Sequence, residues 1–99
     1  MADSLPRLGI IIASSCPGRV GLPVSQWFVP VAQAYGGFDV DVIDLAEVGL
    51  PFLDEPRHPR LREYEHAHTR AWSERIDAVD ALVVVTPEYN YGMPAILKN

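Results

Sequence analysis

Two short runs of β-branched apolar residues limit what this chain can fold into. They are "RLGIIIAS", from Arg7 to Ser14, and "DALVVVT", from Asp80 to Thr86. Each is too short for an ordinary helix and apolar without alternation, which is typical of a strand buried on both faces of a parallel sheet. Between them, "FDVDVIDL", from Phe38 to Leu45, alternates apolar and acidic residues. That alternation predicts a strand with one solvated face, as at a sheet edge.

Helical patterns connect these three predicted strands. "LPVSQWFVPVAQAYGG" carries an apolar stripe at helical spacing, although Pro30 should kink that helix or end it early. The stripe consists of Val24, Trp27, Phe28, Val31 and Tyr35. "REYEHAHTRAWSERIDAV" predicts a second helix, and a third begins near Pro94. We expect Trp27 and Trp72 to be core residues. Strands alternating with helices predict right-handed crossovers and a doubly wound α/β sheet, with strand order 2-1-3.

Length and charge narrow the class of protein. The 99 residues fit one domain, residues 1–99, without a linker. A net charge of −5 without a basic cluster argues against nucleic acid as a partner. The single cysteine, Cys16, excludes an intrachain disulfide and suits a reducing compartment. The N-terminus lacks the pattern of a signal peptide, and no apolar run is long enough to span a bilayer. These features predict a cytoplasmic protein without a membrane partner.

The loop after the first strand, "SSCPGRVG", suits a phosphate group. Its serines offer hydroxyls, its glycines let backbone amides approach, and the following helix start offers free N–H groups. Arg19 adds a charged donor that can bind phosphate through two N–H groups. An ordinary capped turn explains this loop equally well. No GxGxxG motif is present, so a dinucleotide site is unsupported, and Asp44 is interpreted as a solvated residue at a strand end.

The loop after the third strand, "TPEYNYGM", suits a planar aromatic ligand. Tyr89 and Tyr91 supply apolar faces with polar tips, and Asn90 can bond a ligand or brace the loop. Gly92 permits close approach or an unusual backbone dihedral. The alternative is a turn that caps the next helix, with the tyrosines packed on neighbours. With strand order 2-1-3, the two loops form the two lips of one crevice at the carboxyl ends of the strands.

A family resemblance joins these motifs. "TPEYNYGMPAILKN" resembles the signature of the NADPH-dependent FMN reductase family, flavodoxin-like proteins that include quinone and azo-dye reductases. "ASSCPGRVGLPVSQWF" resembles that family's phosphate loop and first helix, and the middle of the chain is similar as well. The resemblance covers essentially the whole chain. It implies a flavodoxin-like fold that here comprises about three strands.

The resemblance also implies a noncovalent FMN and a set of residues that hold it. The phosphate would bind Ser14, Arg19 and the backbone of Val20, Gly21 and Leu22. The isoalloxazine would lie against Pro87, Glu88, Tyr89, Asn90 and Tyr91. In such enzymes NADPH reduces the flavin, which passes electrons to a quinone, an azo compound or free flavin. Because the cofactor carries the chemistry, no catalytic residue is expected. A homodimer or larger homo-oligomer is implied for the full-length form.

The chain departs from the family pattern in two respects. Cys16 stands where the family usually carries an arginine or similar polar residue, which should weaken phosphate binding; we interpret it as an inert small residue, with an oxidisable thiol as the alternative. The family's domain is about twice as long, so the chain corresponds to its N-terminal half. The alternative to a reductase is therefore a non-catalytic fragment that binds flavin weakly or needs a partner chain, with the third strand as an exposed edge.

Two properties stay open, the electron acceptor and the choice between NADPH and NADH. No metal site is expected at His58, His66 and His68. The last two are two residues apart in a predicted helix and should point to different faces.

Overall fold

A three-stranded parallel sheet forms the centre of the molecule. The computed structural model describes residues 4–99. The strands are β1 (Arg7–Ile12), β2 (Asp39–Asp44) and β3 (Ala81–Val85), in the order β2-β1-β3. In the middle of the sheet Ile10 of β1 aligns with Val42 of β2 and Val83 of β3. The predicted α/β architecture and the order 2-1-3 are therefore confirmed.

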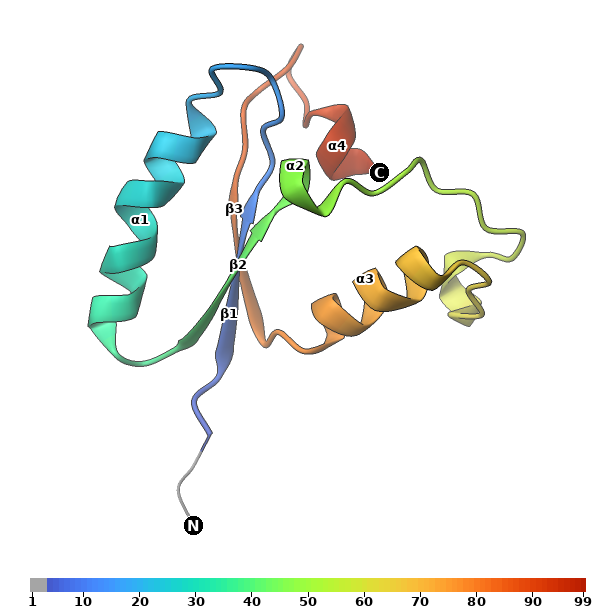
Figure 1. Cartoon of the computed structure of the whole chain (residues 1–99), viewed down its shortest axis with the longest axis horizontal. Coiled ribbons are helices and arrows are strands. Elements are labelled where there is room, and N and C mark those ends of the chain that lie inside the picture. The colour runs from blue at the N-terminus through green and yellow to red at the C-terminus, as the bar shows by residue number, and fades with distance from the viewer. Residues whose placement is uncertain (1–3) are drawn as a thin grey trace.

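Helices lie on both faces of the sheet (Figure 1). Helix α1 (Gly21–Tyr35) covers one face and α3 (Ala67–Asp77) lies on the other. Three short helical segments complete the fold: α2 (Leu45–Val48), a 3₁₀ helix (Pro59–Leu61) and α4 (Ala95–Lys98). No helix within residues 4–99 combines the length and the apolarity that crossing a bilayer requires.

The core consists of two layers that share β1. Ile11, Ile43 and Leu45 pack with Trp72 and Ile76 of α3 on one face. On the other face, the buried residues are Leu8 and Ile10 of β1 and Ala32 of α1. Phe28, Val83 and Val85 pack against them. Alternate residues of β1 thus feed opposite layers, which explains why its run of apolar residues is continuous.

Helix α1 buries a different face from the one predicted. Trp27 is 68% exposed, so its assignment to the core was wrong, and of the predicted stripe only Phe28 packs on the buried core cluster. The buried positions are small ones, Ser25 and Ala32. Small residues let the helix approach the sheet closely, so its larger apolar residues lie on the flanks. Pro30 does not end the helix early, since α1 continues to Tyr35.

The third strand is an edge, as expected, but it is not buried on both faces. Leu82 and Val84 are exposed, whereas Val83 and Val85 pack on the α1 layer. β3 pairs only with β1 within residues 4–99, and α1 covers only one of its faces. The prediction of a doubly buried strand was therefore wrong, because a continuous apolar run does not reveal how much of each face its neighbours cover.

Candidate functional site

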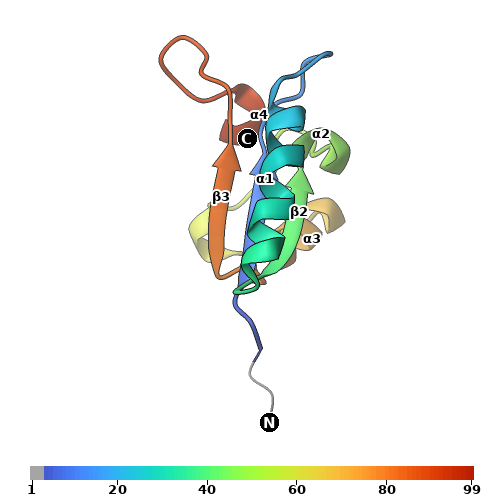
Figure 2. The same cartoon turned by 90° about the vertical axis from the view of Figure 1, so that its left-hand side faces the viewer.

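The two predicted loops meet at the carboxyl end of the sheet. Figure 2 shows the loop after β1 and the loop after β3 extending beyond the same end of the sheet. Between them lies a cavity of about 430 Å³. Its wall includes Ser14, Cys16, Arg19, Val20, Gly21, Thr86, Pro87 and Tyr89. The crevice with two lips that strand order predicted is present in the structure.

Ser14 marks the floor of this cavity. It is only 5% exposed, and its Oγ has no hydrogen-bond partner within residues 4–99. A Cβ on Gly21 would lie 2.3 Å from that Oγ, so only glycine leaves room for the hydroxyl. A buried hydroxyl without a partner is uncommon in folded proteins, and a bound ligand or water would satisfy it.

The start of α1 supplies donors beside Ser14. Val20, the N-cap, has no side chain that bonds the first N–H groups, and the first turn contains no acidic residue. These N–H groups and the positive end of the helix dipole lie next to the orphan hydroxyl. Together they form a site suited to an anion such as a phosphate group.

Arg19, which lines the cavity, is bound by Asp44. Its Nη1 and Nη2 donate to the two carboxylate oxygens of Asp44 at 2.6 and 2.7 Å, and Nη1 also donates to the Ser14 carbonyl oxygen at 2.8 Å. The side chains are 15% and 7% exposed. Asp44 also caps α2 by accepting from the backbone N–H of Ala46. The interpretation of Asp44 as a solvated strand-end residue was therefore wrong.

This ion pair shifts the titration of both partners. The hydrogen bonds from Arg19 lower the pKa of Asp44 despite the opposing effect of its burial. The same bonds raise the pKa of Arg19. Asp44 is therefore a carboxylate, and Arg19 a guanidinium, throughout the neutral range.

Low pH should lower the stability of the fold by protonating Asp44. A carboxyl group with a lowered pKa in the folded state stabilises the fold above its unfolded pKa of about 3.9, and this contribution is lost as pH falls through the folded value. We expect the melting temperature to fall as the pH is lowered from about 5 to about 2. The fall should be smaller in Asp44→Asn than in the parent protein. Circular dichroism melts of both proteins would measure the difference. Parallel pH curves would contradict the assignment.

The loop after β3 is a tight turn joined to the opposite lip. Tyr89 and Gly92 exchange two backbone hydrogen bonds of 2.9 Å, and Asn90 and Tyr91 between them have φ values of 51° and 65°. The unusual dihedrals therefore lie at Asn90 and Tyr91, and not at Gly92. Tyr89 Oη lies 3.2 Å from Cys16 Sγ, which connects the two lips, and this contact raises the pKa of Tyr89.

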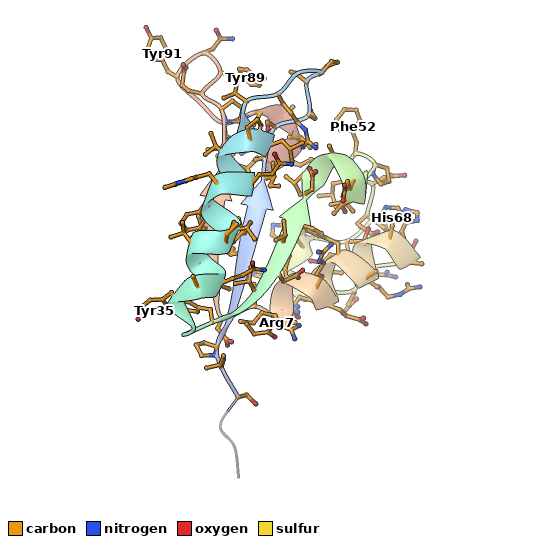
Figure 3. All side chains as sticks on the ribbon, turned by 60° about the vertical axis from the view of Figure 1, so that its left-hand side comes forward. Arg7, Tyr35, Phe52, His68, Tyr89 and Tyr91 are labelled. Carbon is orange, nitrogen blue, oxygen red and sulfur yellow. The ribbon has the colours of Figure 1, made fainter. Side chains whose placement is uncertain are left out.

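The structure brings together some predicted cofactor-binding residues and separates others. Ser14, Arg19, Val20, Gly21, Pro87 and Tyr89 line the same cavity. Leu22, Glu88, Asn90 and Tyr91 do not line it. Figure 3 shows Tyr91 at the outer tip of its loop, and its side chain is fully exposed. The carboxylate of Glu88 accepts from the backbone N–H of Tyr91 and so shapes that tip.

The residues that the sequence interpretation missed are Asp44 and Cys16. Asp44 ends the strand that neighbours β1, and its charge is opposite to that of the only cation in the loop after β1. This combination could have indicated the pair. Cys16 was interpreted as an inert small residue, and nothing in its local sequence indicated a contact with a tyrosine 73 positions away.

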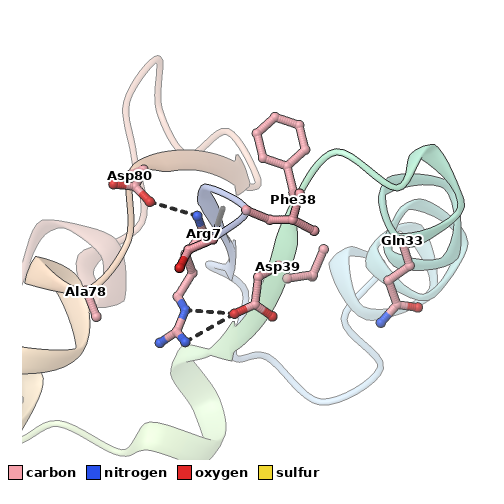
Figure 4. A pocket seen from close by; sticks show the side chains of 9 residues that line it. Arg7, Gln33, Phe38, Asp39, Ala78 and Asp80 are labelled. Atoms are coloured by element: carbon pink, nitrogen blue, oxygen red, sulfur yellow. Dashed lines mark hydrogen bonds and ion pairs between the residues drawn. The ribbon is translucent and has the colours of Figure 1, made fainter. Parts of the chain in front are cut away.

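A larger concavity of about 850 Å³ lies at the opposite end of the sheet (Figure 4). Two of its charged side chains are already paired, because the Arg7 guanidinium donates to Asp39 at 3.1 and 3.3 Å. The Asp80 carboxylate accepts from the backbone N–H of Arg7. It lies at the amino ends of the strands, whereas ligands of open α/β sheets bind at the carboxyl ends. We therefore place the candidate site in the smaller cavity.

No three His, Cys, Asp or Glu side chains gather in residues 4–99 as a group able to hold a metal ion. The rings of His66 and His68 are stacked, with centroids 5.2 Å apart. The expectation that they point to different faces was wrong, because His66 precedes α3 instead of lying in it.

Comparison with known proteins gives one consistent family. The family model described as NADPH-dependent FMN reductase matches residues 6–99. An NAD(P)H-dependent FMN reductase of Schizosaccharomyces pombe is 35% identical over 96 residues, which are 95% of this chain and 48% of that protein. One of Saccharomyces cerevisiae is 38% identical over 66 residues, 61% of this chain and 35% of the relative. A 2-hydroxy-1,4-benzoquinone reductase of a Burkholderia species is 37% identical over 62 residues, which are 63% of this chain and 31% of that protein. The chain spans about half the length of the curated relatives it matches, or less.

Proposed function

The chain belongs to the NADPH-dependent FMN reductase family, and on that premise we propose that it binds FMN in the crevice between its two loops and takes part in electron transfer from NAD(P)H to a small acceptor. The observation that carries this proposal is the buried Ser14 hydroxyl, which has no partner among the described residues 4–99 and faces Gly21 at the start of α1. A phosphate group would supply the missing partner.

The phosphate end of the site is built from the loop after β1. The Ser14 hydroxyl and the backbone N–H groups of Val20, Gly21 and Leu22 would donate to the phosphate oxygens. Arg19 would add its remaining N–H groups and positive charge. The absence of a side-chain cap at Val20 supports this assignment, because the helix N–H groups are then available to a ligand.

The flavin end is built from the loop after β3. Pro87 and Tyr89 line the cavity and would pack against the isoalloxazine. Glu88, Asn90 and Tyr91 would contact the part of the ring that extends beyond the cavity. FMN would supply the hydride and electron chemistry, while these residues orient it and exclude water. The cavity volume of about 430 Å³ is within the usual range for small-ligand sites.

For the acceptor we propose a quinone. A Burkholderia relative is named a 2-hydroxy-1,4-benzoquinone reductase, and a Thiobacillus denitrificans relative an FMN-dependent NADH:quinone oxidoreductase. An azo compound and free flavin are the other acceptors to test. We further propose that the protein works in the cytoplasm as a homodimer or larger homo-oligomer.

Replacing Ser14 by alanine tests the proposed phosphate site. Each hydrogen bond to a charged phosphate contributes about 1.5–3 kcal/mol, so Ser14→Ala should weaken FMN binding by about tenfold or more. Binding of riboflavin, which lacks the phosphate, should change little. Fluorescence titration of the full protein with both flavins measures these affinities.

Ser15→Ala is the matched control, because Ser15 is the adjacent residue, is exposed and does not line the cavity. It should bind both flavins as the parent protein does. A parent protein that binds neither flavin, or a Ser14→Ala variant that weakens FMN and riboflavin equally, would contradict the proposed site.

A further inference from the structure

The orientation of Arg19 depends on a residue outside the cavity. Asp44 holds both terminal nitrogens of the guanidinium, and the Ser14 carbonyl oxygen takes a third bond. An arginine has five N–H donors in a rigid plane. Asp44 and Ser14 therefore occupy three of them and leave the edge formed by Nε and one N–H of Nη2 without a partner among residues 4–99.

Asp44 is also held by a contact that does not involve Arg19. It is the last residue of β2, and its carboxylate also accepts from the backbone N–H of Ala46 at 3.1 Å. It is buried and does not belong to the cavity wall. A carboxylate anchored in this way is a rigid attachment point for a flexible arginine.

The same guanidinium also fixes the floor of the cavity. Its bond to the Ser14 carbonyl oxygen constrains the residue whose hydroxyl lacks a partner. A further bond, from the Arg19 backbone N–H to the Cys16 carbonyl oxygen at 3.0 Å, closes the intervening turn. The loop after β1 is thus tied to β2 through one side chain.

We propose that Asp44 is a positioning residue of the phosphate site, which holds Arg19 and the Ser14 segment in the arrangement that receives the phosphate of FMN. This inference rests on the proposed function. Asp44 would not touch the phosphate itself. Its role would be to bind one edge of the guanidinium and keep the other available, as an outer-shell partner does for a ligand residue.

Asp44→Asn tests the proposal in the full protein. The amide can accept only one of the two bonds, so Arg19 loses its fixed orientation. We expect the affinity for FMN to fall about tenfold, as with outer-shell substitutions at other sites, while the affinity for riboflavin, which does not occupy the phosphate site, stays within about twofold. The ratio of the two dissociation constants is the readout, because a merely structural defect would weaken both flavins alike.

Asp41→Asn is the matched control. Asp41 lies three positions earlier in the same strand and makes an equivalent two-bond pair with Arg75, at 2.8 and 3.1 Å, away from the cavity. Removing its charge should leave the FMN-to-riboflavin ratio unchanged. The double variant Arg19→Gln with Asp44→Asn should be no weaker than Arg19→Gln alone, since Asp44 acts through Arg19. If Asp44→Asn does not fold because Arg19 is left unpaired, the comparison of the double variant with Arg19→Gln still tests the proposal.

Two results would overturn this inference while leaving the proposed function intact. An unchanged ratio in Asp44→Asn would mean that Asp44 has only a structural role. Tighter FMN binding would mean that Asp44 competes with the phosphate for Arg19. A parent protein without affinity for FMN would overturn the proposed function and this inference with it.

Discussion

Replacing Gly21 by alanine is expected to remove most of the affinity for FMN. The new Cβ would lie 2.3 Å from Ser14 Oγ and 3.2 Å from Ser14 Cβ, so the hydroxyl or the start of α1 must shift. At least two hydrogen bonds to the phosphate would be lost, each worth about 1.5–3 kcal/mol, which predicts about a hundredfold weaker binding or more. Fluorescence titration with FMN measures the loss.

The fold should survive this substitution, because alanine is a better helix former than glycine. Riboflavin is the control ligand, because it lacks the phosphate. Its affinity should change far less than that of FMN in Gly21→Ala. FMN affinity that stays within about threefold in Gly21→Ala, a change below 1 kcal/mol, would show that the phosphate does not bind at the start of α1.

Replacing Ile10 by alanine is expected to have the largest effect on stability. Ile10 is fully buried in the central strand, between β2 and β3, and packs in the α1 layer. Such a truncation costs about 3–4 kcal/mol through lost transfer energy and the cavity it leaves. A domain of this size has a total stability of about 5–15 kcal/mol, so the variant should lose a large part of its free energy of unfolding. Urea denaturation followed by circular dichroism measures the change.

Two other substitutions calibrate that result. Ile10→Val removes one methylene and should cost about 1 kcal/mol. Leu82→Ala, at an exposed position of β3, should cost less than Ile10→Ala because Leu82 already contacts water. Equal losses at Ile10 and Leu82 would mean that the core is not organised around β1 as described.

Much of the fold could be predicted from local pattern. The continuous apolar run of β1 and the alternation of β2 identified a central strand and an edge strand, and the intervening helices required parallel connections. The two ligand loops followed, because parallel strands end at the same side of a sheet. The buried face of α1 could not be predicted in this way. Its spacing indicated Trp27, whereas the small residues Ser25 and Ala32 let the helix approach the sheet.

The chemistry of the candidate site was predictable as residue types, but not as contacts. Serine, glycine and arginine after an apolar strand indicated an anion site, and two tyrosines near a glycine indicated a flat ligand. Their partners lie far along the chain: Arg19 binds Asp44, 25 positions away, and Cys16 meets Tyr89, 73 positions away. Such contacts depend on strand order and loop geometry, which cannot be inferred from the local sequence around each residue.

The order of the elements, the parallel sheet and the two loops at its carboxyl end follow from local sequence patterns, because they depend on periodicity and chain direction. Which donors remain available to a ligand depends instead on how the folded chain packs. Within the described part of the chain, the Ser14 hydroxyl has no partner and three of the Arg19 N–H groups are bonded. A polar group's availability depends on every neighbour within hydrogen-bond distance, and packing brings those neighbours from separate strands.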